Sequence, residues 1–437
     1  MSPSPARTPI SRRQTIVATT IGNALEFFDF TVYGFLALVI GKLFFPTLDA
    51  YGQLLLTVAT FGVGFIMRPL GGIVIGAYAD RAGRKKAMTL TIFLMALGCA
   101  MIAFTPTYAQ IGVAAPLLMV LARLIQGFSA GGEVGASTTL LVEHATPANR
   151  GYMASWQFAS QGLGILLGAV VVGILSATLA PPAMESWGWR VPFALGMLIA
   201  PVGMYIRRRL QESFEPETEG GGSATRRGSL SEVCGRHGKT VLGAILSIIG
   251  GTAAAYVVTF YMPTYAIREL GLPPPVALFG AALTGLLSFG LAPLVGRWSD
   301  RHGRKPLIVW SRIALVLLIY PGFLWLNASP TPIVLFTVVG VLSVTLVIQT
   351  VPGITMLPEV FPKHVRASGM SLVYSVGVAL FGGFSPLIST WLLNATGNKL
   401  APAWYLLVMT LASLFGLLWL EDFTGRDIDA ADAHQPA

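Results

Sequence analysis

Long apolar runs recur along the whole chain, and they constrain its fold more than any other feature. Each run is long enough to cross a bilayer as a helix. Charged residues make up 11% of the 437 residues, against about 25% in an average soluble domain. The chain is therefore expected to be an integral membrane protein. We place its spans near 16–42, 52–79, 87–105, 111–141, 151–179, 190–207, 240–263, 275–297, 307–327, 332–357, 367–393 and 402–420.

Lysine and arginine are distributed unevenly between the loops. Of the 29 such residues, 22 lie in the termini and the even-numbered loops, four lie in the odd-numbered loops, and Arg68, Arg123 and Arg312 lie within spans. Cytoplasmic loops carry the excess of positive charge, so both termini are expected in the cytoplasm. Membrane topology thus accounts for the net charge of +9, and we expect no nucleic acid partner.

Two motifs occur once in each half of the chain. The stretch GAYADRAGRKK at 76–86 recurs as GRWSDRHGRKP at 296–306, and each joins the second and third span of its half. A glutamate seven residues before an arginine also occurs twice, between the fourth and fifth span of each half. Two motifs at corresponding positions of the two halves indicate an internal repeat. Parallel six-helix repeats are typical of transporters with a site between the halves.

The longest loop separates the two repeats. It is polar and rich in Gly and Glu, which is typical of a flexible linker. We expect a six-helix bundle over residues 1–207, a cytoplasmic linker over 208–239, and a second six-helix bundle with a tail over 240–437. The predicted fold class is all-α integral membrane, with twelve transmembrane helices in two six-helix bundles. We expect a monomer in the lipid bilayer.

The first span carries polar groups where a span should be apolar. The stretch GNALEFFDF places Asn23, Glu26 and Asp29 on one helical face with Tyr33, within an arc of about 120°. A charge at the bilayer centre costs about 2.5–3.5 kcal/mol, so this face should point into the bundle or a water-filled cavity. The group either fixes helix packing as a buried polar network or takes part in function.

Proton coupling is the function that these acids predict. Burial disfavours the charged form of a carboxyl, so a buried acid can hold a proton in one state and release it in another. We expect Asp29, near the middle of the span, to carry the coupling proton. Glu26 and Glu133 are further candidates, with packing and an ion pair as their alternatives, and Arg68 lies deep in the second span.

Arg123 lies near the centre of the fourth span. Arginine forms planar, bidentate hydrogen bonds with a carboxylate, so a central arginine that faces a cavity suits an organic acid. The alternative is an internal pair with Asp29 or Glu133. Other candidate substrate contacts are polar residues at helical spacing; they are Asn23, Tyr33, Gln126, Gln157, Gln161, Tyr256, Thr259 and Gln349, and the glutamines could equally join helices.

The second half differs from the first. Its central spans hold no acid and no lysine, and Arg312 falls near a cytoplasmic end in the predicted spans. We therefore expect charge chemistry in the first half and neutral contacts from the second. The sequence has no nucleophile–base pair and no metal-ligand spacing, so we expect no enzyme activity, no catalytic residue and no metal.

The motifs together resemble one family. GAYADRAGRKK is similar to the loop signature of the major facilitator superfamily, and RLIQGFSAGGE at 123–133 is similar to its fourth-helix motif. GNALEFFDF, FIMRPLGG, WGWRVPF and EVFPKHVRASG resemble the metabolite–proton symporters, which carry citrate, α-ketoglutarate, shikimate or proline/betaine. The resemblance covers the chain apart from its tails and central linker. RLIQGFSAG, ATPANRGYMASWQFASQ and YMPTYAI are most similar to the citrate carriers of that family.

This resemblance implies a proton-coupled symporter that imports citrate or a related tricarboxylate by alternating access. It implies a bacterial inner membrane location and a proton gradient as driving force, with no cofactor. Alternatives are symport of a dicarboxylate, shikimate or proline/betaine, and proton-driven drug export, which the family motifs disfavour. A receptor that binds solute without moving it is a further class, and the linker offers no output domain for it.

The resemblance also implies charge networks that lock the cytoplasmic side. Simple positive-inside anchoring would explain the arginines and lysines of the repeated loops but not their aspartates. The helix after Arg366 presents a positive dipole end that an aspartate of the other half could meet. The expected gate residues are Asp80, Arg84, Glu143 and Arg150 in the first half, and Asp300, Arg304, Glu359 and Arg366 in the second.

Overall fold

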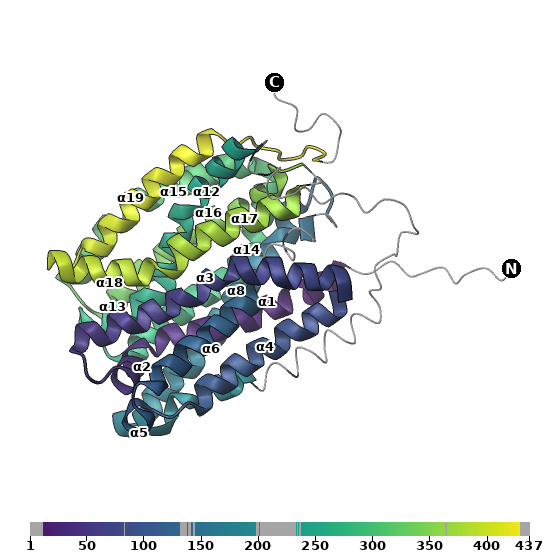
Figure 1. Cartoon of the computed structure of the whole chain (residues 1–437). Helices are drawn as coiled ribbons and strands as arrows, with labels where there is room; N and C mark the ends of the chain where they lie inside the picture. Colours follow the sequence, from purple (N-terminus) through teal and green to yellow (C-terminus); the bar gives the residue numbers. More distant parts are fainter. Residues whose placement is uncertain are drawn as a thin grey trace.

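The computed structural model describes residues 12–82, 84–131, 145–197, 237–362 and 365–428, with isolated positions at 138, 141–142, 201, 233 and 235. Glu133, Glu143 and nearly all of the predicted linker lie outside the described residues, as do the side chains of Asp80 and Arg84. Over the described ranges the chain is helical and contains no strand (Figure 1).

The first half begins with a bent pair of helices. α1 and α2 meet at an angle of 62°, and together they are long and apolar enough to count as one span. Residues 190–197 are helical and fall in the sixth predicted span. The elements of this half are α1 (Arg12–Phe35), α2 (Ala37–Phe44), α3 (Ala50–Ala82), α4 (Arg84–Phe104), α5 (Tyr108–Ile111), α6 (Ala114–Ala130), α8 (Arg150–Thr178), α9 (Pro181–Ala183) and η1 (Met184–Gly188).

The second half contains two spans that are interrupted by a π-helical turn. In Figure 1 most of this half, in green to yellow, lies above the first half, in purple to blue. Its elements are α12 (Gly238–Tyr256), η2 (Val257–Tyr261), α13 (Met262–Arg268), α14 (Pro274–His302), α15 (Arg304–Ala328), α16 (Pro332–Glu359), α17 (Arg366–Val378), η3 (Ala379–Gly383), α18 (Ser385–Thr396) and α19 (Ala401–Leu418).

The predicted fold class is confirmed. Eight described segments are long and apolar enough to cross a membrane, and the bent pair α1–α2 makes a ninth. Shorter apolar helices, Thr89–Phe104 and Ala114–Ala130, coincide with the third and fourth predicted spans. Each of the twelve predicted spans contains a described helix.

Prolines explain the two π-helical turns. Pro263 follows η2, and Pro386 follows η3. A proline inside a helix has no N–H to donate, and its ring pushes away the carbonyl four residues earlier. Those carbonyls belong to Thr259 and Gly382, within the two turns. The seventh and eleventh spans are therefore irregular within their length. In a membrane, irregular backbone is tolerated only where protein or water satisfies it.

Glycines bring α8 and α14 into backbone contact across the two halves. A Cβ built on Gly162 would lie 2.6 Å from the amide nitrogen of Phe289, and one on Gly285 would lie 2.5 Å from that of Leu166. Real side chains do not approach so closely, so these two helices can meet in this way only where the side chain is a hydrogen. The contact joins the first half to the second.

A second close approach joins α3 to α6 inside the first half. A Cβ on Gly127 would collide with the carbonyl oxygen of Gly64. Arg68 lies one helical turn after Gly64, and Arg123 lies one turn before Gly127. This contact therefore fixes where the two deep arginines of the first half meet the face of α1.

Gly285→Ala tests the contact between the halves. The added methyl group should force α8 and α14 apart and lower the free energy of unfolding by about 1–3 kcal/mol, as overpacking does. Gly290→Ala, in the same helix, is the matched control because a Cβ there meets no atom within 4 Å. Thermal unfolding in detergent should separate the two variants, and equal melting temperatures would contradict the contact.

Candidate functional site

A cavity lies between the two halves. Its volume is about 880 Å³ when the open solvent at its mouth is included. Phe27, Phe158, Gln161 and Ile165 line it from the first half, and the rest of its wall comes from the second half. Of the predicted substrate contacts, Gln161, Tyr256, Thr259 and Gln349 are at this wall.

Arg312 also lines this cavity. In the predicted spans Arg312 falls near a cytoplasmic end, and only neutral contacts were expected from the second half, so a cation at this wall was not predicted. α15 begins at Arg304, so Arg312 lies about 12 Å along the helix axis. The available signal was that, in the second half, Arg312 is the one lysine or arginine that lies within a predicted span and away from its last residue.

Arg123 is in a buried cluster and not at the cavity wall. Its side chain is 0% exposed, and its Nη1 lies 3.4 Å from Asp29 Oδ2 and 2.8 Å from Gln126 Oε1. The Cys99 thiol donates to Asp29 Oδ1 at 3.0 Å. The structure thus contains the internal pair with Asp29 that the sequence left open as an alternative.

Glu26 and Arg68 form a second buried ion pair. Arg68 Nη2 lies 2.6 Å from Glu26 Oε1, and both side chains are almost fully buried. The guanidinium of Arg68 also stacks over the rings of Phe30 and Phe65, at 4.8 and 4.4 Å from their centroids. Arg123 packs over Phe30 from a second direction, at 4.7 Å. Aromatic faces stabilise both cations where water is excluded.

Asn23 holds α1 against α8. Its Nδ2 donates to the backbone oxygen of Gln157 at 3.0 Å and to Ser160 Oγ at 2.8 Å. Neither Asn23 nor Gln157 lines the central cavity. Among the described residues, both side-chain polar atoms of Gln157 lack a hydrogen-bond partner, although they are buried. The polar face of α1 is therefore divided among three neighbouring helices: α3, α6 and α8.

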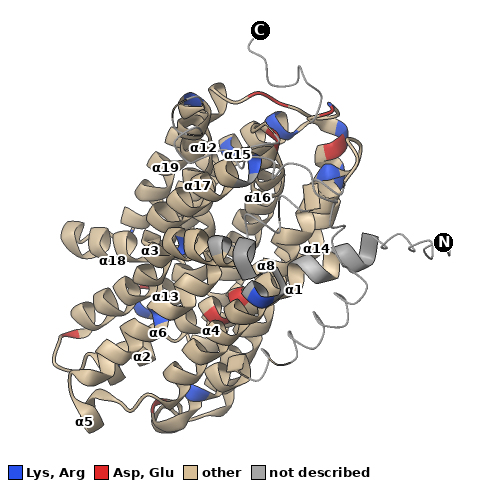
Figure 2. Cartoon of the chain, turned by 45° about the vertical axis from the view of Figure 1, so that its right-hand side comes forward, with Lys and Arg blue, Asp and Glu red and all other residues tan. Residues whose placement is uncertain are grey.

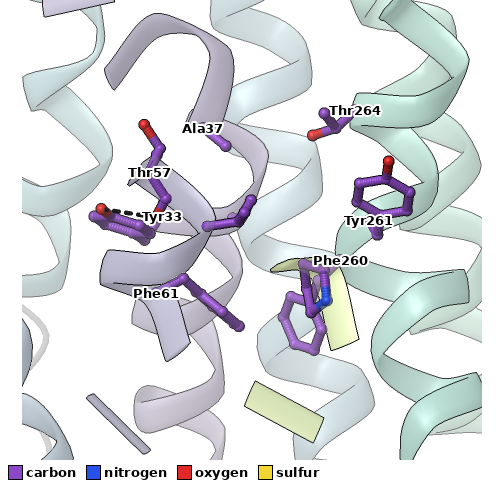
Figure 3. Close-up of a pocket in the computed structure, with 10 residues that line it drawn as sticks. Tyr33, Ala37, Thr57, Phe61, Phe260, Tyr261 and Thr264 are labelled. Carbon is purple, nitrogen blue, oxygen red and sulfur yellow. Dashed lines mark hydrogen bonds between the residues drawn. The ribbon is translucent and has the colours of Figure 1, made fainter. Parts of the chain in front are cut away.

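Tyr33 lies at a different, smaller pocket. Figure 3 shows its hydroxyl directed to Thr57, to whose backbone oxygen it donates at 3.4 Å. Phe61 and Phe260 line the same pocket from the two halves. Phe260 also lines the central cavity, so it forms part of the wall between the two spaces.

An aromatic layer joins the halves at this wall. Ring centroids of Phe61 and Phe260 lie 5.7 Å apart, and those of Phe65 and Tyr256 lie 5.5 Å apart. Tyr256 and Phe260 are themselves 5.1 Å apart. Within this layer, Phe61 lines the pocket of Figure 3, Tyr256 lines the cavity, and Phe260 lines both.

Charges gather where the halves meet at one end of the bundle. Figure 2 shows most charged residues at the ends of helices and a few within the bundle. Arg150 of the first half lies 2.9 Å from Glu359 of the second half. Arg304 lies 3.3 Å from the same glutamate oxygen and 3.0 Å from Asp300. Glu359 is thus shared by arginines of both halves.

Asp300 binds the first turn of α8 across the halves. Its two oxygens accept from the backbone N–H groups of Gly151 and Tyr152, at 2.7 and 2.9 Å. These N–H groups have no partner inside the helix, and the helix dipole favours an anion there. The sequence proposed such a contact at the helix after Arg366; the described contact is its counterpart in the other repeat.

Arg366 is buried and donates to backbone oxygens of Phe361 and Ile428, at 3.3 Å each. The predicted partners in the first-half loops, Asp80, Arg84 and Glu143, cannot be placed because their side chains lie outside the described residues. Within the described part of the chain, no group of three or more His, Cys, Asp or Glu residues could hold a metal ion.

Two family models match the chain. The model described as "Sugar (and other) transporter" matches residues 15–216, and the model described as "Major Facilitator Superfamily" matches residues 281–433. Among solved structures, the partially occluded, inward-open xylose transporter XylE from E. coli is similar in fold. Its TM-score is 0.75 at 18% sequence identity, over 95% of this chain and 99% of that chain.

Curated relatives are similar over nearly their whole length. The citrate-proton symporter of Klebsiella pneumoniae is 37% identical, over 93% of this chain and 91% of that relative. The citrate-proton symporter of Salmonella typhi is 38% identical, over 94% of each. The proline/betaine transporter of Escherichia coli K12 is 32% identical, over 96% of this chain and 85% of that relative. The chain therefore belongs to the major facilitator superfamily of membrane transporters.

Proposed function

We propose that the protein is a proton-coupled symporter that imports citrate or a closely related tricarboxylate. The observation that carries the proposal is the ion pair between Asp29 and Arg123 inside the bundle. It joins a group that can take up a proton to a group that can bind a carboxylate. The similarity to two citrate-proton symporters supports citrate as the substrate.

Coupling follows from the geometry of this pair. The contact between Arg123 Nη1 and Asp29 Oδ2 is long for a charge-assisted hydrogen bond and uses one donor. Among the described residues, Nε and Nη2 of Arg123 have no hydrogen-bond partner. When Asp29 takes up a proton it loses its charge and its hold on Arg123. The guanidinium is then free to attract an organic anion, so proton binding and substrate binding favour one another.

The remaining site residues take supporting parts in this proposal. Gln161, Tyr256, Thr259 and Gln349 contact substrate directly from the cavity wall. Glu26 and Arg68 keep the α1 face neutral beside the coupling pair, with Glu133 as a further candidate outside the described residues. Asn23, Tyr33, Gln126 and Gln157 position α1 and Arg123 for the substrate.

Alternating access would come from rocking of the two halves. We assign residues 1–207 and 240–437 to the moving bundles and 208–239 to the linker between them. The contacts of Asp300 and Glu359 with α8 lock one end of the cavity. The distribution of lysine and arginine assigns that end, and both termini, to the cytoplasm of a bacterial cell, with the chain a monomer in the inner membrane.

Proline or betaine is the second candidate substrate, because a transporter of that class is 32% identical to this chain. A zwitterion needs an anionic partner for its ammonium group. The described cavity wall carries Arg312 and no Asp or Glu. This positive charge favours an anion such as citrate over a zwitterion as the substrate.

Transport itself gives the first test. Proteoliposomes that contain the protein should accumulate labelled citrate when the outside is more acidic than the inside, and an uncoupler should abolish the accumulation. Empty liposomes are the control. Equal accumulation driven by a sodium gradient, without a proton gradient, would contradict the proposal. Competition by a panel of organic acids, proline and betaine would rank the substrates.

Asp29→Asn tests the coupling role. The amide is nearly isosteric with the protonated acid, so substrate should still bind and exchange of internal for external citrate should persist. Net uphill uptake should be lost, because no proton can be released inside. Glu26→Gln is the matched variant on the same helix and should lose less. Retained accumulation by Asp29→Asn would move the coupling role to Glu26 or Glu133.

Asp300→Asn tests the lock. It keeps the size of the side chain but removes the charge that meets the first turn of α8, a contribution of about 0.3–1 kcal/mol for the dipole alone. We expect a cysteine at Ser155, which lies against Gly296, to react faster with a maleimide from the cytoplasmic side. Asp422→Asn is the control, because the described contacts of Asp422 stay within the second half. Unchanged labelling would refute the lock.

A further inference from the structure

Arg312 is a buried cation at the wall of the central cavity. It projects from α15 and is 4% exposed. Gln349 of α16 lines the cavity beside it, and Gln161 of the first half lines the same cavity. Arg312 is thus within the space that the proposed substrate would enter, on the side contributed by the second half.

The described partners of Arg312 are all neutral. Its Nη1 donates to the backbone oxygen of Ser413 at 2.9 Å, its Nη2 donates to that of Ser247, and its Nε donates to Gln349 Oε1 at 3.4 Å. These acceptors lie on α19, α12 and α16, so the guanidinium is held in one orientation. They use three of its five donor hydrogens and leave two.

No carboxylate balances this charge among the described residues. Four other buried arginines each have an acid within 4 Å; they are Arg68, Arg123, Arg150 and Arg304. Arg312 has none in the described part of the chain. A buried charge without a counter-ion is costly, and it is retained where a ligand or function requires it.

Gln349 adds a second donor at the same place. It is 1% exposed, and its Oε1 accepts from Arg312, so its amide nitrogen is not used in this contact. Among the described residues, Nε2 of Gln349 has no hydrogen-bond partner. The charged fork and the neighbouring amide therefore both offer unused N–H groups, and a carboxylate is the acceptor that suits such a set.

We propose that Arg312 and Gln349 form a subsite in the second half that binds one carboxylate of the transported acid. This inference rests on the proposed function and deepens it. Arg123 is buried behind the cavity wall in this structure. It serves a carboxylate from the first half once protonation of Asp29 releases its side chain, and Arg312 serves another from the second half. A polycarboxylate can then engage both halves at once, whereas a monocarboxylate or a zwitterion can engage only one.

The alternative is that Arg312 only ties α12, α16 and α19 together. Citrate binding to the purified protein in detergent, measured by calorimetry, separates the two roles. Arg312→Gln should raise the Kd for citrate about tenfold or more, as loss of a charged hydrogen bond does. Arg297→Gln, which removes the same charge from the exposed end of α14, should change the Kd less than about threefold.

Gln349→Glu keeps the test valid if Arg312→Gln does not fold. The new carboxylate would pair with Arg312 inside the protein, so the fold is kept and the subsite is filled. Citrate affinity should fall further than in Gln349→Ala, which only removes the amide. If Arg312 only ties helices together, Gln349→Glu preserves that role. A citrate affinity of Gln349→Glu that equals or exceeds the affinity of Gln349→Ala would therefore overturn the subsite. An unchanged Kd in folded Arg312→Gln would overturn it as well.

The wild-type protein separates this inference from the proposed function. If it binds another di- or tricarboxylate and not citrate, the citrate assignment fails, and the same variants test the subsite with that acid. If it binds proline or betaine and no carboxylic acid with two or more acid groups, both ideas fail. If citrate binds and the variants behave like wild type, the function stands and the subsite falls.

Discussion

A charge that enters the apolar part of a bilayer must find a partner inside the protein, and the rest of this structure depends on that constraint. Two acids on α1 meet two arginines, in the pairs Glu26–Arg68 and Asp29–Arg123. Each pair joins α1 to a different helix, so the position of α1 is set by charge as much as by packing. The same constraint makes Arg312 conspicuous, because its described partners carry no charge.

Glycine contacts make these pairs geometrically possible. The approach of Gly64 to Gly127 brings α3 and α6 within backbone distance, and the arginines one turn away on each helix then reach the same face of α1. Both guanidinium groups pack over the ring of Phe30. Small residues and charges thus act together. The glycines set the distance between helices, and the ion pairs determine which helix faces are in contact.

The apolar runs and the acids of the first span could be predicted from the sequence, because span length and the cost of buried charge are local properties. The partners of these acids could not be predicted, since they depend on how the helices rotate against one another. The sequence allowed Arg123 to face either a cavity or Asp29, and only the packing of α6 against α1 decides this. The place of Arg312 at the cavity wall was not predicted, because it depends on how α15 packs against α12, α16 and α19. The contact of Asp300 with α8 was expected in the other repeat, since the two repeats offer the same motifs.

One oxygen of Glu359 is contacted by Arg150 from the first half and by Arg304 from its own half. In the proposed rocking motion Arg304 would stay beside the acid, so Glu359 would not be left as a bare buried anion. Arg150 would lose this contact and the one that its Nη2 makes with the backbone oxygen of Arg426, and water would replace them at its side chain. The unlocking step therefore avoids the desolvation penalty that breaking an isolated buried pair would carry. An ion pair shared in this way can close one end of the cavity tightly and still open quickly. Tight closure therefore need not slow transport.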